Sequence, residues 1–295
     1  MVHNIFKGLG IALITPFLED GSVDYEALIR LVDWQLKNGA DFFCILATTG
    51  ETPTLTREER QKIKDMVVDY VQGRVPILMG CGGYNTAAVV EELKTGDFRG
   101  VDGILSICPY YNKPSQEGLY QHFKAISAAT SLPIVLYNVP GRTGVNMQAA
   151  TTVRLARDCQ NIVAIKEASG NLEQVDEIIK NKPHDFDVIS GDDALTFPMV
   201  SCGAVGAISV IGNALPKEFS RMIRLQMRGE YDPARVIHHR FTDLFSLLFV
   251  DGNPAGVKAL LTEMGFIKNQ LRLPLVPTRV TTLQKISSII KELKL

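Results

Sequence analysis

The sequence predicts an α/β fold, namely a closed (β/α)8 barrel of the TIM-barrel type with a C-terminal helical appendage. Short apolar runs bounded by turn residues alternate with amphipathic segments eight times within residues 1–228. Eight β/α units in a segment of this length match the usual size of such a barrel. A doubly wound open sheet is the alternative, but no Gly-x-Gly-x-x-Gly motif follows the first apolar run. We therefore expect the closed barrel.

Eight apolar runs, several of them rich in β-branched residues, are expected to form the barrel strands. They are Gly8–Ile14, Phe42–Leu46, Val75–Met79, Gly103–Ile107, Pro133–Tyr137, Ile162–Ile165, Phe186–Ser190 and Val205–Ser209. The carboxyl ends of parallel barrel strands open on one face, so the residues that follow these runs should gather at a single mouth.

Amphipathic segments with capping signals are expected to form the helices between the strands. Asp24 is a typical N-cap residue, and Thr56 with Glu59 has the spacing of a capping box. The predicted helices begin at Asp24 and Thr56 and then cover Thr86–Phe98, Ser115–Ala129, Gln148–Arg157, Leu172–Lys180, Asp193–Ser201 and Lys217–Arg228.

The pattern changes after Arg228, which predicts a barrel domain over residues 1–228 and a helical domain over residues 229–295. Three further helices are expected in the second part, over Asp232–Phe249, Pro254–Met264 and Thr282–Leu293. This part carries no chemical motif, so we expect it to cover the barrel or to form an oligomer contact.

Composition excludes several classes of function. The net charge of the 295 residues is −1, so the chain has no excess of positive charge that would attract nucleic acid or an anionic membrane. No apolar run approaches the roughly 20 residues of a membrane-spanning helix, and the first ten residues do not read as a secretory signal. The five cysteines are scattered without disulfide or zinc spacing. A cytoplasmic protein without a metal is the expectation.

Lys166 directly follows the sixth apolar run and is the first candidate for catalysis. A lysine amine among apolar walls is poorly hydrated as an ammonium, which favours the neutral, nucleophilic form. A single lysine at a strand end more often leads the chain back to solvent. The interpretation of Lys166 therefore depends on the other residues at the barrel mouth.

Hydroxyl groups and a guanidinium follow the other strands. Thr48 and Thr49 come after the second run, Tyr137 ends the fifth, and Arg142 lies just beyond it. Singly, each of these residues has a commoner role in a turn, a packed ring or a solvated loop. Together at one mouth they suit carbonyl chemistry, in which Lys166 forms a Schiff base, tyrosine relays protons and Arg142 binds a carboxylate.

Two kinds of site are not supported by the sequence. No histidine lies at a predicted strand end, which argues against a histidine-based triad or a histidine-rich metal site. The loops after the seventh and eighth runs contain Asp192 and Asp193 but no nearby lysine or arginine. An unphosphorylated keto acid therefore fits this mouth better than a phosphate ester.

Over essentially its whole length, the chain resembles the pyruvate-dependent class I aldolases and lyases, and within them the dihydrodipicolinate synthase family. The residues that carry this resemblance are Thr48–Glu51, Pro109–Pro114, Tyr137–Gly144, Ile165–Ala168 and Ser190–Asp193. The resemblance implies a cytoplasmic lyase in which Lys166 forms an imine with pyruvate. Attack of the derived enamine on aspartate semialdehyde would be the first committed step of diaminopimelate and lysine biosynthesis. No cofactor is implied.

The resemblance also implies roles for the remaining site residues. Tyr137, Thr49 and Tyr111 would relay protons, with Tyr111 reaching the site from a neighbouring subunit of a homotetramer built from tight dimers. Thr48 and Thr49 would hold the pyruvate carboxylate, and Arg142 the carboxylate of the semialdehyde. The pocket would be completed by the backbone of Gly191 and Ile208.

Two other functions remain open. N-acetylneuraminate lyases and other 2-keto acid aldolases are similar at Tyr137 and Lys166, but the lyases lack the loop Gly141–Gly144 and must admit a long sugar. A barrel that binds a keto acid as a non-catalytic sensor is a more distant alternative, because every catalytic position is retained here.

One departure concerns regulation. Family members inhibited by lysine have histidine, asparagine and glutamate in an interface cleft. This chain has Pro53, Arg57, Arg60, Tyr84 and Ala88 at the matching positions. A cleft with arginines and no carboxylate should repel a cationic amino acid, which predicts weak or absent lysine feedback.

Overall fold

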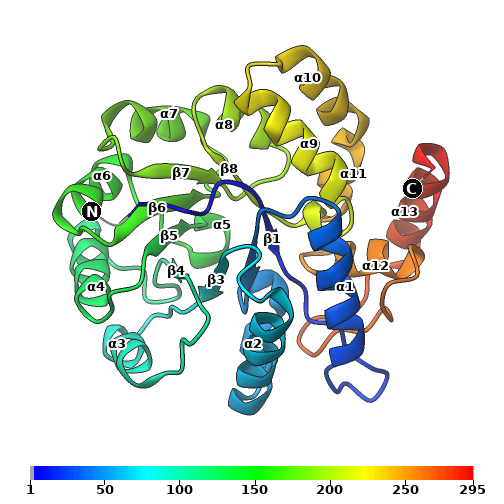
Figure 1. Ribbon diagram of the computed structural model, residues 1–295, viewed down its shortest axis with the longest axis horizontal. Helices are drawn as coiled ribbons and strands as arrows, with labels where there is room; N and C mark the ends of the chain where they lie inside the picture. The colour runs from blue at the N-terminus through cyan, green and yellow to red at the C-terminus, as the bar shows by residue number, and fades with distance from the viewer. Residues whose placement is uncertain (1–2, 295) are drawn as a thin grey trace.

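The computed structural model describes residues 3–294 and contains a closed barrel of eight parallel strands (Figure 1). Each strand pairs with the next along the chain, and β1 pairs with both β2 and β8, which closes the barrel. This confirms the predicted fold class. The strands are β1 Gly8–Ala12, β2 Phe42–Ile45, β3 Ile77–Gly80, β4 Gly103–Ile107, β5 Ile134–Asn138, β6 Ile162–Glu167, β7 Asp187–Ser190 and β8 Gly206–Ser209.

The barrel interior is a packed core rather than an open channel. Phe42 shows how tightly it is filled, because a Cβ on Gly10 would lie 2.2 Å from the Phe42 ring. Glycine at position 10 thus leaves room for this ring inside the barrel. The buried residues of the interior cluster include Phe6, Ala12, Phe42, Cys44, Leu78, Leu105, Val135, Tyr137, Ala164, Ile189 and Ile208.

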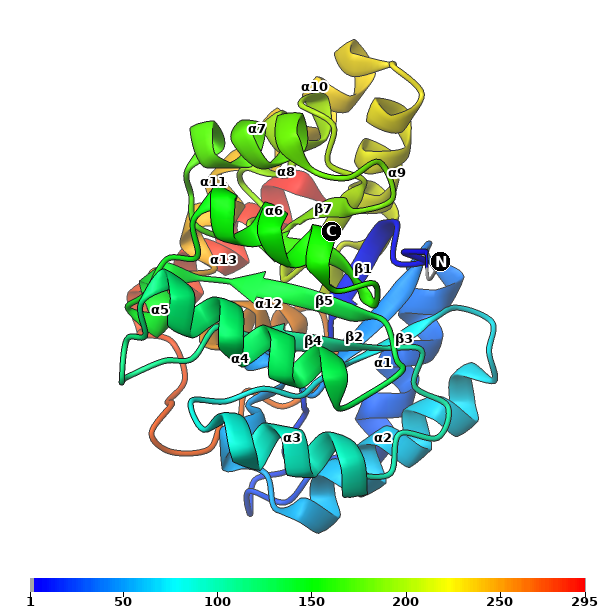
Figure 2. The same ribbon diagram turned by 90° about the vertical axis from the view of Figure 1, so that its left-hand side faces the viewer.

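The barrel helices surround the strands (Figure 2). They are α1 Tyr25–Lys37, α2 Arg57–Val71, α3 Thr86–Thr95, α4 Gln116–Ala128, α6 Ala149–Asp158, α7 Leu172–Asn181, α8 Thr196–Ser201 and α9 Pro216–Met227. The predicted caps are confirmed, since Asp24 accepts a hydrogen bond from the Ala27 N–H and both halves of the Thr56–Glu59 capping box are present.

Helix α8 begins three residues later than the sequence predicted. The carboxylate of Asp193, the expected start, accepts hydrogen bonds from the backbone N–H groups of Val210 at 3.0 Å and Ile211 at 2.7 Å. Asp193 therefore connects the loop after β7 to the loop after β8 instead of starting the helix. Burial raises the pKa of Asp193 to about 6.

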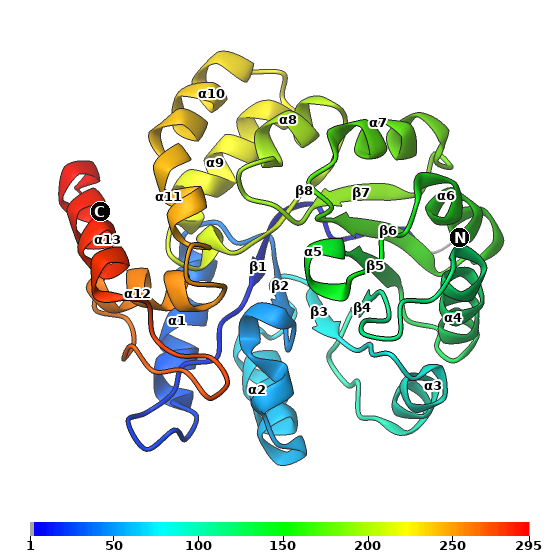
Figure 3. The same ribbon diagram turned by 180° about the vertical axis from the view of Figure 1, so that it is seen from behind.

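Four short elements that the sequence did not predict lie in the loops after the strands. They are η1 Thr48–Gly50, η2 Thr52–Thr54, α5 Pro140–Thr143 and η3 Ile211–Asn213. Figure 3 shows α5 on the side of the barrel that faces the viewer. These single turns shape the mouth of the barrel, because η1 and η2 follow β2, α5 follows β5 and η3 follows β8.

The C-terminal part consists of α10 Tyr231–Arg240, α11 Thr242–Leu247, α12 Ala255–Glu263 and α13 Val280–Leu293, with α13 at the edge of the molecule (Figure 1). The single helix expected over Asp232–Phe249 is wrong, because the chain bends at Phe241, which is buried between α10 and α11. The division at residue 229 stays a prediction. No helix within residues 3–294 is long and apolar enough to cross a membrane.

The stability of the fold should depend on pH through His122. This residue of α4 is buried, and burial lowers its pKa from 6.5 to about 4. The unfolded chain binds the proton more readily than the folded chain. The free energy of unfolding is therefore unaffected by His122 above pH 6.5 and falls by about 3 kcal/mol as the pH drops towards 4. Urea unfolding of His122→Phe should show a shallower loss in this window, whereas His184→Asn, at an exposed histidine, should follow the parent protein. Parallel profiles for His122→Phe and the parent would contradict the prediction.

Candidate active site

Lys166 and Tyr137 lie side by side on neighbouring strands at the barrel mouth. The parallel register of β5 and β6 pairs them directly. The Lys166 side chain is inside the barrel, with the residue only 5% exposed, and its Nζ atom lies 4.3 Å from the centre of the Tyr137 ring. The fold therefore places an amine and a phenol in one small space, as Schiff-base chemistry with a proton relay requires.

Gly191 lies directly against the Lys166 side chain, and Ile208 is buried in the same barrel interior. A Cβ on Gly191 would lie 3.0 Å from both Cε and Cγ of Lys166 and 2.8 Å from the Cβ of Ala168. Only glycine fits against the lysine here without a shift of its neighbours. Ile208 is buried in the barrel interior, two residues before the loop that Asp193 holds.

Behind the strands, a buried carboxylate fixes β5 to β6. Successive strand residues face opposite sides, so Glu167 points away from the barrel interior where Lys166 points into it. Its oxygens accept hydrogen bonds from the side chains of Asn138 at 3.1 and 3.2 Å and Gln174 at 3.1 Å, and from the Ser169 N–H at 2.7 Å. Burial raises the pKa of Glu167. Sequence reasoning gave Glu167 no role, although its place directly after Lys166 in an apolar run is an available signal.

Thr48 and Thr49 sit on the single turn η1 directly after β2, and the structure separates them. Thr48 is half-buried and lines the same cavity as Tyr137. Thr49 is only 3% exposed, and its Oγ1 accepts a hydrogen bond from the side chain of Asn253. The turn is held by Thr15, whose hydroxyl donates to the Gly50 carbonyl at 2.7 Å. Position favours Thr48 for a relay with Tyr137, while the relay role expected for Thr49 stays a prediction.

A cavity of about 390 Å³ opens at the mouth of the barrel. Its polar lining includes Thr48, Tyr110, Tyr137 and Arg142. Arg142 is exposed on α5, where its charge can meet an anion arriving from solvent. The hydroxyl of the neighbouring Thr143 donates to the Val145 carbonyl at 2.9 Å and lies 3.3 Å from the Val139 carbonyl, which fixes this turn.

Tyr111 lies apart from this group within the single chain. It is 89% exposed, and its φ of 72° is in the left-handed region that a tyrosine seldom adopts. The adjacent Tyr110 packs edge-on against Tyr84, with ring centres 5.2 Å apart. The loop therefore holds the Tyr111 ring outward, away from Lys166 of its own chain.

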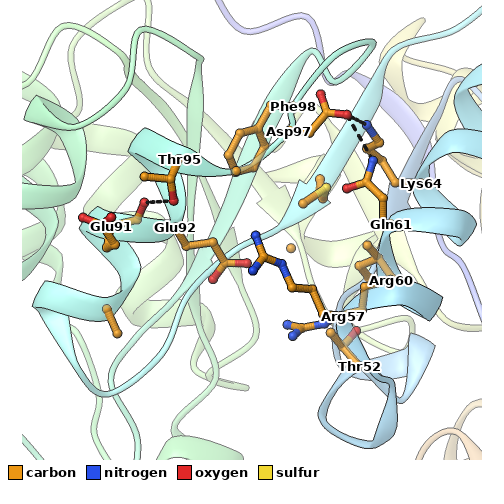
Figure 4. Close-up of a pocket in the computed structure, with 15 residues that line it drawn as sticks. Thr52, Arg57, Arg60, Gln61, Lys64, Glu91, Glu92, Thr95, Asp97 and Phe98 are labelled. Atoms are coloured by element: carbon orange, nitrogen blue, oxygen red, sulfur yellow. Dashed lines mark hydrogen bonds and ion pairs between the residues drawn. The ribbon is translucent and has the colours of Figure 1, made fainter.

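A second cavity, also of about 390 Å³, lies between α2 and α3 (Figure 4). Arg57, Arg60 and Ala88 line it, as do the carboxylates of Glu91 and Glu92. Arg60 and Glu92 also line the first cavity, so the two adjoin. The expectation of a cleft without a carboxylate is therefore wrong. Sequence reasoning missed Glu92 because it lies one helical turn after Ala88, outside the matched positions.

Metal ligands are not grouped in the described structure. Within residues 3–294, no group of three or more His, Cys, Asp or Glu side chains is placed to hold a metal ion. The reactive groups at the mouth are instead an amine, hydroxyls and a guanidinium. The expectation that no cofactor takes part stays a prediction.

Comparison with known proteins identifies the family. A model of the dihydrodipicolinate synthetase family matches residues 5–293. The chain belongs to this family. It is 66% identical to the 4-hydroxy-tetrahydrodipicolinate synthase of Phocaeicola vulgatus, over 100% of this chain and 99% of that protein.

Solved structures of family members have the same fold. The dihydrodipicolinate synthase from Thermotoga maritima superimposes with a TM-score of 0.96 at 42% identity, covering 99% of both chains. The enzyme from Cyanidioschyzon merolae, solved with lysine bound, gives a TM-score of 0.94 at 40% identity and also covers 99% of both chains.

Replacing Gly191 should disable Lys166. In Gly191→Ala, the new Cβ would press on the Lys166 side chain and displace the amine, which should lower kcat about a hundred-fold. Steady-state kinetics measures the loss. Gly83→Ala is the matched control, because its Cβ would make only an ordinary contact at 3.6 Å. A Gly191→Ala enzyme with the parent rate would show that Lys166 tolerates the crowding.

Proposed function

We propose that this chain is a 4-hydroxy-tetrahydrodipicolinate synthase, a lyase that joins pyruvate to aspartate semialdehyde through an imine on Lys166. The observation that carries the proposal is the direct pairing of Lys166 with Tyr137 at the mouth of the barrel. Membership of the family and the 66% identical relative of that name support it. The free cysteines of the described chain support a reducing cytoplasm as its compartment.

The chemistry needs only groups of this chain and its substrates. The Lys166 amine attacks the keto carbon of pyruvate, and the keto oxygen leaves as water. The imine withdraws electrons, so a methyl proton is lost and an enamine forms. The enamine carbon bonds to the aldehyde carbon. The amino group of the semialdehyde then attacks the imine carbon, the bond to Lys166 breaks, and the cyclic product leaves. No cofactor is required for these steps.

Hydroxyl groups carry the protons in this proposal. Tyr137 is close enough to Lys166 to serve the imine. We assign the next position in the relay to Thr48, which lines the cavity with Tyr137. The pyruvate carboxylate is assigned to Thr49 and the neighbouring backbone. We prefer Thr48 to Thr49 for the relay because Thr48 lines the cavity beside Tyr137, whereas the Thr49 oxygen accepts a hydrogen bond from Asn253.

Arg142 sets the preference for the second substrate. An exposed guanidinium at the cavity entrance favours a small aldehyde with a carboxylate over a long neutral polyol. This argues for aspartate semialdehyde and against N-acetylneuraminate, the substrate of the runner-up activity. A non-catalytic sensor would have no need for the Lys166–Tyr137 pair.

Tyr111 supports assembly with a second copy of the chain. We propose a homotetramer of tight dimers in which the outward Tyr111 ring enters the cavity of its partner and extends the relay from Tyr137. The ring is available to a partner because Tyr111 is 89% exposed, and its backbone has a positive φ of 72°. A large exposed aromatic residue held in an unfavourable conformation indicates a partner or a function.

The catalytic proposal is tested by trapping. With pyruvate and borohydride, the parent protein should gain one reduced pyruvate adduct on Lys166 by mass spectrometry, and Lys166→Ala should gain none. Turnover should be seen with pyruvate and aspartate semialdehyde but not with N-acetylneuraminate. Absence of an adduct on Lys166 would falsify the lyase proposal. Turnover of N-acetylneuraminate alone would favour the runner-up.

The shared site is tested by mixing two inactive variants. Tyr111→Phe and Lys166→Ala each lack one component, but a mixed dimer should contain one site with both, so mixing should restore up to about a quarter of the parent activity. Native mass spectrometry of mass-tagged chains confirms that mixed dimers form. Mixed dimers without recovered activity would argue that Tyr111 acts within its own chain or not at all.

Lysine should inhibit this enzyme weakly. Arg57 and Arg60 oppose a cationic amino acid in the cavity between α2 and α3, although the same lining holds the carboxylates of Glu91, Glu92 and Asp97. Activity should therefore persist at lysine concentrations well above the low-millimolar range, and Arg60→Gln should increase inhibition. Half-inhibition of the parent enzyme by low-millimolar lysine would show that the carboxylates of this cavity outweigh its arginines.

A further inference from the structure

Asn253 reaches the active-site loop from the C-terminal part of the chain. It lies between α11 and α12, which pack beside the barrel (Figure 3). Its Nδ2 atom donates a hydrogen bond to Oγ1 of Thr49 at 3.0 Å, although the two residues are 204 positions apart. Asn253 is only 7% exposed. This contact is therefore a buried link between the helical appendage and η1.

The direction of this hydrogen bond decides what Thr49 can do. A hydroxyl has one proton to donate and lone pairs that accept. Because Asn253 occupies a lone pair of Thr49, the Thr49 O–H is left to donate to another acceptor. The carboxylate of a keto acid is such an acceptor, and a hydrogen bond to a charged oxygen is stronger than one to a neutral group.

Helix α12, which begins two residues after Asn253, is held against the same loop. Glu51, two residues after Thr49, forms a fully buried ion pair with Lys258 of α12. The Lys258 Nζ also donates to the Gln270 carbonyl at 2.9 Å, and the Arg272 N–H donates to Glu51 at 3.2 Å. The loop after η1 is thus joined to α12 and to Arg272, and these contacts hold Asn253 in place beside Thr49.

We propose that Asn253 is a positioning residue for the keto-acid substrate, acting through Thr49. It holds the Thr49 oxygen so that the O–H points at the substrate carboxylate, while Thr48 remains available for the proton relay with Tyr137. The proposal rests on the proposed function and deepens it. It gives the helical appendage a part in substrate recognition as well as in covering the barrel.

A double-mutant cycle tests the proposal. Asn253→Ala should raise the KM for pyruvate about ten-fold, the size of one hydrogen bond to a charged acceptor, and leave kcat within about two-fold. Thr49→Val should raise it similarly, and adding Asn253→Ala to Thr49→Val should have little further effect, since the link is already lost. Thr49→Ser keeps the hydroxyl and should stay close to the parent KM. If the rise in the pyruvate KM of the double variant equals the product of the rises in the two single variants, the proposal is overturned.

Two further variants separate positioning from a loss of structure. Asn253→Asp preserves the shape but can only accept from Thr49, so it should raise the pyruvate KM even if Asn253→Ala folds poorly. Asn269→Ala makes the same kind of change after α12, at a residue that donates no hydrogen bond to η1, and should retain the parent KM. An equal rise in Asn269→Ala, or no rise in Asn253→Asp, would overturn the proposal.

Borohydride trapping keeps this test distinct from that of the proposed function. At saturating pyruvate, the parent and Asn253→Ala should form the same adduct on Lys166, with only the half-saturating pyruvate concentration shifted. No adduct in the parent would overturn the lyase function and this proposal with it. An adduct in the parent, together with an unshifted Asn253→Ala, would overturn only the role of Asn253.

Discussion

The pairing of β5 with β6 is the constraint on which the site depends. A closed parallel barrel allows little slip between strands, and here the register sets Tyr137 beside Lys166. Glu167 adds to this by accepting hydrogen bonds from β5, from α7 and from the loop after β6. A shift of one residue would turn Lys166 outward and bring Glu167 into the barrel. The chemistry of the mouth therefore follows from backbone pairing that is fixed on the opposite face of the same two strands.

A second buried charge links the two parts of the chain. The Glu51–Lys258 ion pair is withdrawn from water, and such pairs contribute little net stability because desolvation offsets their attraction. Burial lowers the pKa of Lys258 to about 8, which reflects that cost. Loss of one partner would leave an unpaired charge and cost about 3–5 kcal/mol. The pair therefore specifies where α12 docks against η1 more than it strengthens the fold.

Much of the fold could be predicted from the sequence, since apolar runs and capping residues report local structure. The strands that carry Tyr137 and Lys166 were found in this way, and so was the start of α2 at Thr56. Contacts between distant residues leave no local pattern. Asp193 was expected to start α8, but its partners are N–H groups in another loop. Glu92 was missed because helix α3 brings it to a cavity whose other wall is α2.

Thr48 and Thr49 mark the limit of what residue type and spacing can tell. They are identical neighbours on one turn, and consecutive side chains of such a turn point in different directions. Thr48 meets the cavity and Thr49 meets Asn253, so their environments differ although their chemistry is the same. The local sequence does not show this difference, because Asn253, the hydrogen-bond partner of Thr49, lies in the helical appendage. A motif at a strand end thus specifies which groups reach the mouth. Hydrogen-bond partners from distant parts of the chain then decide where each hydroxyl can donate its proton.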